Sequence, residues 1–200
     1  MAFLRSSSAF ENPVITGKGL YLRTPTIMDY EEWAQLRSDS RAFLAPWEPT
    51  WPADDLTRTA FRRRIRRYLS EIREDHAYPF FIFREGDDTL LGGITVSNVT
   101  RGMTQCGTIG YWMGECHAGR GYMTGAVVAL APFAFRVLHL HRIEAACLPH
   151  NAPSMRLLEK AGFTREGVAR GLVCIAGRWQ DHVVYSLLAD DSAASGPPQF

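Results

Sequence analysis

Apolar and polar residues alternate along several short stretches of the chain. This alternation predicts β-strands, because successive side chains of a strand point to opposite faces. Residues 19–24 alternate most clearly, and stretches separated by acidic or glycine-containing turns predict further strands over residues 78–84, 90–98 and 108–114. Residues 141–148 predict the next strand. Two final stretches, residues 168–175 and 178–188, are joined across Ala176-Gly177, which predicts a closing β-hairpin.

Other stretches repeat apolar residues every three or four positions, as the buried face of a helix does. They predict helices over residues 27–38, 55–75 and 153–161. Thr26 and Asn151 are candidate N-caps, and Gly162 follows the last of these helices, where a left-handed residue is favoured. Three prolines predict a loop over residues 43–55. Helices interleaved with mostly antiparallel strands indicate a mixed α/β fold.

Length and composition predict one folded domain with two short extensions. A chain of 200 residues, 46 % hydrophobic and 22 % charged, is ordinary for a globular protein and long enough to bury a sizeable core. Residues 1–18 are expected to form an N-terminal arm, residues 19–188 the domain, and residues 189–200 a disordered tail.

Charge and cysteine content narrow the function classes. The formal net charge of +1 predicts no strong field for nucleic acid or membrane. The four cysteines stand far apart without a CxxC pair, which favours reduced thiols in the cytoplasm over a disulfide framework or a zinc site. His139 and His141 have no accompanying carboxylate cluster, so no metal is expected. The apolar runs are too short for a membrane span or a signal peptide.

The stretch HAGRGYMTG, residues 117–125, places three glycines directly before an apolar, helix-like run over residues 126–138. Glycine lets the backbone turn tightly and approach a ligand, and the first N–H groups of a helix attract phosphate. The stretch contains no GxxxxGK[ST] pattern, and in GxGxxG the third glycine would fall at Thr124. Taken alone, the stretch is either a turn that begins a helix or a phosphate site.

This loop resembles the signature of the Gcn5-related N-acetyltransferase family, [Q/R]-x-x-G-x-[G/A], between a strand and a helix. Residues 118–123 keep its central glycine, Gly121, and depart from it at both ends. The segment NAPSMRLLEKAGF, residues 151–163, is similar to the family's asparagine-led helix. Eight pieces in order, spread over residues 19–188, look like the RimJ/RimL group of ribosomal-protein-alanine N-acetyltransferases: FLAPWEP, SNVTRG, IGYWMG, HRIEA, PHN, EKAGF, REG and GRWQDH.

The resemblance implies a fold and a co-substrate. The fold would be a mixed, mostly antiparallel twisted sheet with flanking helices, in which the strand before the loop splays from the next strand. Acetyl-CoA would lie in the splay, with its pantetheine arm along the strand and its phosphates on the loop amides. The implied contacts are Trp112, Met113, Gly119, Arg120, Gly121, Tyr122, Met123, Thr124, Asn151 and Ser154.

The resemblance also supplies candidate catalytic residues. The tyrosine that protonates the leaving thiolate in many acetyltransferases falls at Leu158, whereas RimL-like members place a serine where Ser154 lies, so Ser154 is the candidate acid. The glutamate of RimL-like members falls near Val173 and is absent. Glu48, in the proline-containing loop, is the substitute candidate for the base. The acceptor pocket would be lined by Trp47, Glu48, Asn98 and Tyr111.

Three further side chains can be considered for a catalytic role. Asp181 and His182 either hold the strands of the closing hairpin together or take a catalytic part. Cys116 lies next to the glycine loop, but no base pattern points to it as an acyl-carrying nucleophile.

The predicted function is acetyl transfer from acetyl-CoA to a primary amine, most specifically the N-terminal alanine of a ribosomal protein, by direct attack in a ternary complex. Two alternatives stay open: a small-molecule acceptor such as a polyamine, amino acid or antibiotic, and a non-catalytic acyl-CoA-binding module. The arginine-rich segment 58–73 is either a solvated face or a guide toward an acidic partner such as ribosomal RNA. The sequence leaves open the acyl group and whether the protein is a monomer or a dimer.

Overall fold

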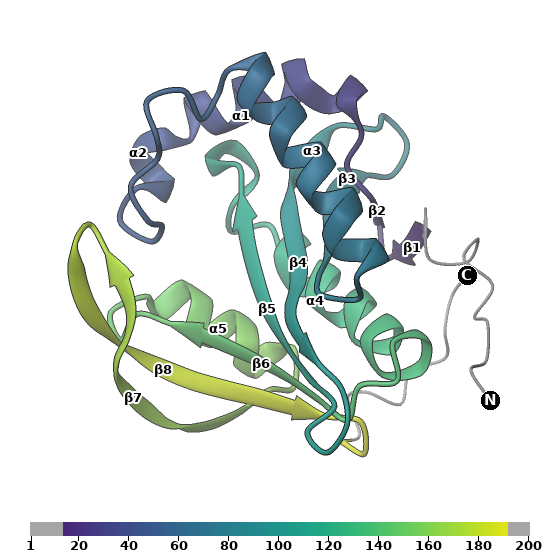
Figure 1. Cartoon of the computed structure of the whole chain (residues 1–200), viewed down its shortest axis with the longest axis vertical. Helices are drawn as coiled ribbons and strands as arrows, with labels where there is room; N and C mark the ends of the chain where they lie inside the picture. Colours follow the sequence, from purple (N-terminus) through teal and green to yellow (C-terminus); the bar gives the residue numbers. More distant parts are fainter. Residues whose placement is uncertain (1–13, 192–200) are drawn as a thin grey trace.

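The computed structural model describes residues 14–191 (Figure 1). Its strands are β1 (Val14–Gly17), β2 (Leu20–Arg23), β3 (Tyr78–Arg84), β4 (Leu90–Thr100), β5 (Cys106–Met113), β6 (Arg142–Cys147), β7 (Thr164–Ile175) and β8 (Arg178–Leu188). Its helices are η2 (Ile27–Asp29), α1 (Tyr30–Asp39), α2 (Arg41–Leu44), α3 (Arg58–Arg73), η3 (Glu115–His117), α4 (Tyr122–Pro132), η4 (Phe133–Val137) and α5 (Ala152–Lys160).

The strands form one sheet in the order β1-β2-β3-β4-β5-β6-β8-β7. Neighbouring strands are antiparallel except β5 and β6, which run parallel. A parallel pair needs a long crossover, and the glycine loop with α4 and η4 supplies it. The predicted mixed, mostly antiparallel sheet with flanking helices is confirmed.

The parallel pair separates after a short ladder. Residues 106–108 of β5 pair with residues 142–144 of β6, and no pairing between the two strands follows within residues 14–191. Beyond that point β5 stays with β4 as far as Met113, while β6 stays with β8 as far as Cys147. The two halves of the sheet therefore diverge into a V, visible between β5 and β6 in Figure 1, and the expected splay is confirmed.

Both faces of the central strands are covered, which explains why β3 is buried from Tyr78 to Phe83. Phe80 and Ile82 point into the larger core, together with side chains of α4 and α5. Phe81 and Phe83 point into a second core with Trp33 of α1 and side chains of α3. Helix α4 packs on one face, against β1, β2 and β4, and α3 packs against β3 on the other. This packing on both faces stabilises the strands next to β5, which pairs with β4.

The structure differs from the predicted elements in several places, including the start of β7, which is Thr164 and not residue 168. Strand β1 lies within the stretch predicted as an arm, and its four residues pair with β2. A short helix, α2, occupies the start of the predicted loop. Helix α3 begins at Arg58, later than predicted, because the Thr57 side chain caps it by accepting a hydrogen bond from the Ala60 N–H. The first thirteen residues of the arm and most of the tail (192–200) lie outside the described residues.

Among residues 14–191, no helix combines the length and hydrophobicity needed to cross a membrane. The four cysteines are free thiols, and Cys147 alone of the four is buried.

The close approach of β4 and β5 requires a glycine at position 92. A Cβ at Gly92 would lie 2.3 Å from the Trp112 carbonyl oxygen, a backbone atom that cannot move aside. We expect Gly92→Ala to lower the free energy of unfolding by about 1–3 kcal/mol, the usual cost of overpacking, in urea denaturation. Gly110→Ala is the matched control, because a Cβ there meets nothing within 4 Å. Equal stability of the two variants would contradict the strand spacing described here.

Candidate active site

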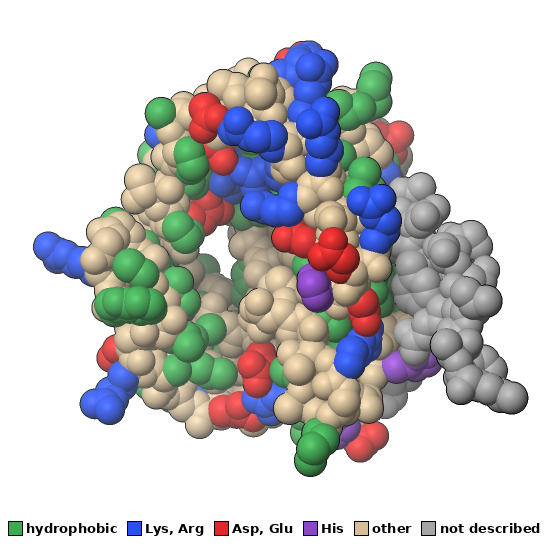
Figure 2. Space-filling view, in the orientation of Figure 1, with side chains coloured by type: hydrophobic (Ala, Val, Ile, Leu, Met, Phe, Trp, Pro, Cys, Tyr) green, Lys and Arg blue, Asp and Glu red, His purple; other side chains and the backbone are tan. Residues whose placement is uncertain are grey.

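A cavity of about 620 Å³ fills the open end of the V. Its walls come from β5, the glycine loop, the end of β6, the start of α5 and the segment after α2. Figure 2 shows the surface hollowed between the two halves of the sheet. Segments distant in sequence therefore meet around one space.

Most of the site residues predicted from the sequence line this cavity. They are Trp47, Glu48, Tyr111, Trp112, Met113, Gly119, Gly121, Tyr122, Met123, Thr124, Asn151 and Ser154. Arg120 is exposed and does not line it.

The structure places Asn98 outside the cavity, contrary to the prediction. Asn98 sits at an irregularity in the β4–β5 pairing, between Ser97 and Thr100, with φ +51°. That part of β4 pairs with the start of β5, where the V is still closed. The pairing of β4 with β5 therefore places Asn98 at the closed end of the V, away from the cavity.

The glycine loop adopts backbone conformations that suit glycine. Gly119 has φ +73° and Gly121, the N-cap of α4, has φ +82°, both in the left-handed region. A Cβ at either position would meet nothing within 4 Å. The two glycines are therefore needed for the turn, and the space beside them is open to a ligand at a helix N-terminus.

Ser154 belongs to a small polar cluster at the start of α5. The Asn151 Oδ1 accepts a hydrogen bond from the Ser154 N–H at 3.1 Å, so the predicted N-cap is confirmed. The Ser154 Oγ lies 2.7 Å from the Tyr111 hydroxyl, and either oxygen can be the donor. Burial raises the pKa of the Tyr111 phenol, while its hydrogen bond with Ser154 lowers it. The net rise keeps the phenol protonated at neutral pH.

Cys147 lies beside this pair and was not predicted as a site residue. It lines the cavity from the last position of β6. Burial raises the pKa of its thiol, and the nearby Ser154 hydroxyl opposes that rise. Cys116 is exposed and does not line the cavity, in keeping with the absence of a nucleophile pattern around it.

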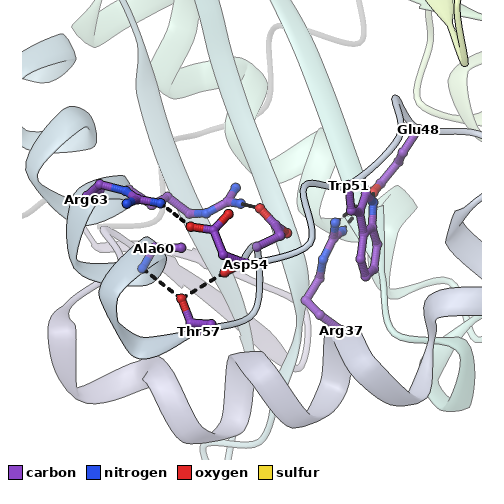
Figure 3. Close-up of polar contacts among 9 residues, drawn as sticks. Arg37, Glu48, Trp51, Asp54, Thr57, Ala60 and Arg63 are labelled. Carbon is purple, nitrogen blue, oxygen red and sulfur yellow. Dashed lines mark hydrogen bonds and ion pairs between the residues drawn. The ribbon is translucent and has the colours of Figure 1, made fainter.

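Glu48 lines the cavity as predicted, and both of its carboxylate oxygens accept hydrogen bonds from neighbouring side chains. Arg37 donates to Oε1 at 2.8 Å and to Oε2 at 2.7 Å, and the Trp51 Nε1–H donates to Oε2 at 2.7 Å (Figure 3). Arg37 is buried, and its guanidinium stacks on Trp51 at 4.0 Å from the ring centroid. These three bonds hold the carboxylate against Arg37 and Trp51 and leave one acceptor position, on Oε1, free.

The closing hairpin contributes one more side chain to the cavity. Asp181 accepts a hydrogen bond from the Gly171 N–H at 2.8 Å and so holds β7 to β8, the structural role predicted for it. His182 is 5 % exposed and lines the cavity. Sequence spacing gives no sign of this, because β8 reaches the cavity only through its pairing with β6. His139 and His141 belong to no metal-ligating group of three or more such side chains in residues 14–191.

The profile of a family described as "Acetyltransferase (GNAT) domain" matches residues 19–164, well over half of the chain. The chain belongs to the GNAT acetyltransferase family. It is an acyltransferase, and acetyl-CoA is its co-substrate.

Individual relatives of this acetyltransferase agree with that assignment. It is 40 % identical to the probable N-acetyltransferase YjcK of Bacillus subtilis over 89 % of this chain and 98 % of that protein. It is 32 % identical to the [ribosomal protein uS5]-alanine N-acetyltransferase of Escherichia coli, over 82 % and 86 % of the two chains. The solved structure of Mycobacterium smegmatis RimJ in complex with CoA-disulfide superposes with a TM-score of 0.83 at 29 % identity, covering 92 % and 90 %.

Proposed function

We propose that this acetyltransferase modifies the N-terminal amine of a protein, and most specifically an N-terminal alanine of a ribosomal protein. The observation that carries the proposal is one continuous cavity that runs from the glycine loop past Ser154 to Trp47 and Glu48. Such a cavity has room for a co-substrate at one end and an acceptor at the other. The similarity to a uS5-alanine N-acetyltransferase supports a protein acceptor.

The shape of the cavity suits acyl-CoA. The edge of β5 that faces β6 is unpaired after Thr108, so backbone groups around Trp112 and Met113 are free to hydrogen bond the amides of a pantetheine arm. The amides of residues 119–124 would take the phosphates at the start of α4. The thioester would then lie beside Asn151 and Ser154.

Acetyl transfer in this arrangement needs no covalent enzyme intermediate. The neutral amine attacks the thioester carbonyl, a C–N bond forms, and the C–S bond breaks. The amine nitrogen loses a proton to a base, and the departing thiolate gains one. Ser154 would donate the second proton and regain one from the Tyr111 hydroxyl, 2.7 Å away, or from water. The first turn of α5 also favours negative charge at this point.

Co-substrate binding should depend on the turn at Gly121. Gly121→Val puts a branched side chain at φ +82° and into the space for a phosphate. We expect calorimetry to show at least an about tenfold loss of acetyl-CoA affinity, equal to about 1.4 kcal/mol. Gly102→Val is the control, because Gly102 has φ +77° in a turn outside the cavity and carries the same backbone strain. Unchanged binding in a folded Gly121→Val variant would remove the loop from the proposal.

The acceptor class can be settled by mass spectrometry. The protein would be incubated with acetyl-CoA and a panel of peptides that begin with alanine, serine or a blocked residue, alongside polyamines, amino acids and aminoglycosides. We expect α-amine acetylation of the alanine peptide at the highest rate. Transfer to small amines alone would overturn the protein acceptor. Binding of acetyl-CoA without transfer to any amine would favour the non-catalytic module.

Contact with the ribosome through α3 stays a proposal. Four of its seven arginines pair with carboxylates: Arg58 with Glu31, Arg63 with Asp54, Arg64 with Asp55, and Arg67 with Glu71. Arg62, Arg66 and Arg73 are exposed and form no ion pair with other described residues. This pairing reduces the positive charge available to RNA. The cytoplasmic location and the oligomeric state also stay predictions.

A further inference from the structure

The cavity contains a histidine that the mechanism above does not yet use. His182 lies on β8, directly after Asp181 and directly before Val183, which pairs with Cys147 at the end of the β6–β8 ladder. Its Cα partner on β7 is Ala169. His182 therefore lies directly before the residues of β8 that pair with β6, on the open side of the V. Cys147, the last residue of β6, and Ser154 line the same cavity.

The hydrogen bonding of His182 defines its tautomer. The Nδ1 atom lies 3.0 Å from the Gln180 carbonyl oxygen, which can only accept, so Nδ1 carries the proton. In the neutral ring Nε2 is then the proton acceptor. Nε2 forms no hydrogen bond with any residue in 14–191, and it is not among the buried polar atoms that lack a partner. It therefore keeps access to the cavity that the ring lines.

We propose that His182 is the general base of the acetyl transfer, a role that rests on the proposed function. Nε2 accepts the proton that the acceptor ammonium or the attacking amine must lose, directly or through one water molecule. The nitrogen lone pair forms the new C–N bond, and the C–S pair leaves as thiolate at Ser154. The Gln180 carbonyl holds the ring in the reactive tautomer and stabilises the imidazolium through Nδ1–H.

Other ionisable groups of the cavity are less suited to this step. Glu48 is held by Arg37 and Trp51. The phenol of Tyr111 and the thiol of Cys147 have pKa values raised by burial, so both stay protonated at neutral pH. Burial, followed by the charges of Arg84 and Arg120, lowers the pKa of His117, and it lies at the glycine-loop end. Arg156 and Lys160 also line the cavity, but as cations they donate hydrogen bonds and have no lone pair to accept a proton.

The test compares His182→Gln with His141→Gln, whose histidine is exposed directly before β6 and does not line the cavity. Rates of acetyl transfer to an alanine-leading peptide would be measured against pH, and acetyl-CoA affinity by calorimetry. We expect His182→Gln to lose about 10²- to 10⁴-fold in kcat near pH 7, with acetyl-CoA affinity retained. The acidic inflection of the wild-type pH profile should disappear. Added imidazole should partly restore turnover in His182→Ala.

Several outcomes would overturn the proposal. A folded His182→Gln variant with wild-type rate and pH profile would exclude His182 as the base. A uniform loss at all pH values, without rescue by imidazole, would give it a structural role only. If the variants do not fold, the wild-type protein still decides: an NMR titration of His182 must match the acidic inflection of the rate profile, and a mismatch contradicts the proposal. Absence of transfer by the wild-type protein would instead refute the proposed function.

Discussion

Ser154→Ala is expected to slow acetyl transfer about 10²- to 10⁴-fold near pH 7 and by much less near pH 9. The reason is the leaving group: a free thiol has a pKa of about 8.5, so at high pH the thiolate departs without full protonation. The Ser154 hydroxyl sits at the start of α5, 2.7 Å from the Tyr111 oxygen. Steady-state rates across pH would show the effect, with acetyl-CoA affinity almost unchanged.

Tyr111→Phe is the companion variant because it removes the neighbour of Ser154 and leaves the serine hydroxyl in place. The phenol is protonated over the same pH range, since burial raises its pKa. We expect a smaller loss than in Ser154→Ala if the tyrosine only returns a proton to the serine. A loss in Ser154→Ala that is equal at all pH values would mean that Ser154 positions the thioester and donates no proton. Wild-type rates throughout would reduce it to a helix-start residue.

Glu48→Gln is expected to lower stability strongly and turnover only weakly. The change leaves the buried Arg37 guanidinium opposite an amide NH₂ group instead of a carboxylate oxygen. Breaking a fully buried pair costs about 3–5 kcal/mol. Because 22 % of the Glu48 side chain is exposed, we expect a loss of about 2 kcal/mol in the free energy of unfolding. The acceptor KM should rise as the segment after α2 loosens.

Glu31→Gln is the matched control for this prediction. Glu31 pairs with Arg58 at the surface, with 75 % and 50 % of their side chains exposed, and such pairs contribute about 0–1 kcal/mol. Urea denaturation of the two variants separates the buried pair from the exposed one. A fall of about 10²- to 10⁴-fold in turnover of a stable Glu48→Gln variant would instead make Glu48 the base and contradict the role proposed for His182.

Short apolar stretches bounded by turn residues were enough to predict most of the sheet, because its central strands are buried on both faces. They missed β1, whose four residues are too few for a pattern and gain their place by pairing with β2. Periodicity predicted α3, and the residue type of Asn151 predicted the cap of α5. Both features depend on residues that are close in sequence. The splay between β5 and β6 followed only from the family resemblance, because strand separation leaves no local signal.

The cavity was predicted well where the chain itself brings residues together, and poorly where tertiary contacts do so. The glycine loop and the start of α5 are continuous segments. Arg37 and Glu48 lie eleven positions apart on different elements, and nothing local indicates that they pair. Asn98 was misplaced because it lies on the part of β4 that pairs with the start of β5, at the closed end of the V. The sequence left the role of His182 open between the hairpin and catalysis, because its access to the cavity depends on where β6 ends.

A crystal structure of the protein with CoA bound tests the central claim most directly. The account predicts the pantetheine arm along the free edge of β5, the diphosphate on the amides of residues 119–124, and the CoA sulfur beside the Ser154 hydroxyl. The acceptor side would then open toward Trp47, Glu48 and His182. CoA bound elsewhere, or with its sulfur directed away from the start of α5, would contradict the account.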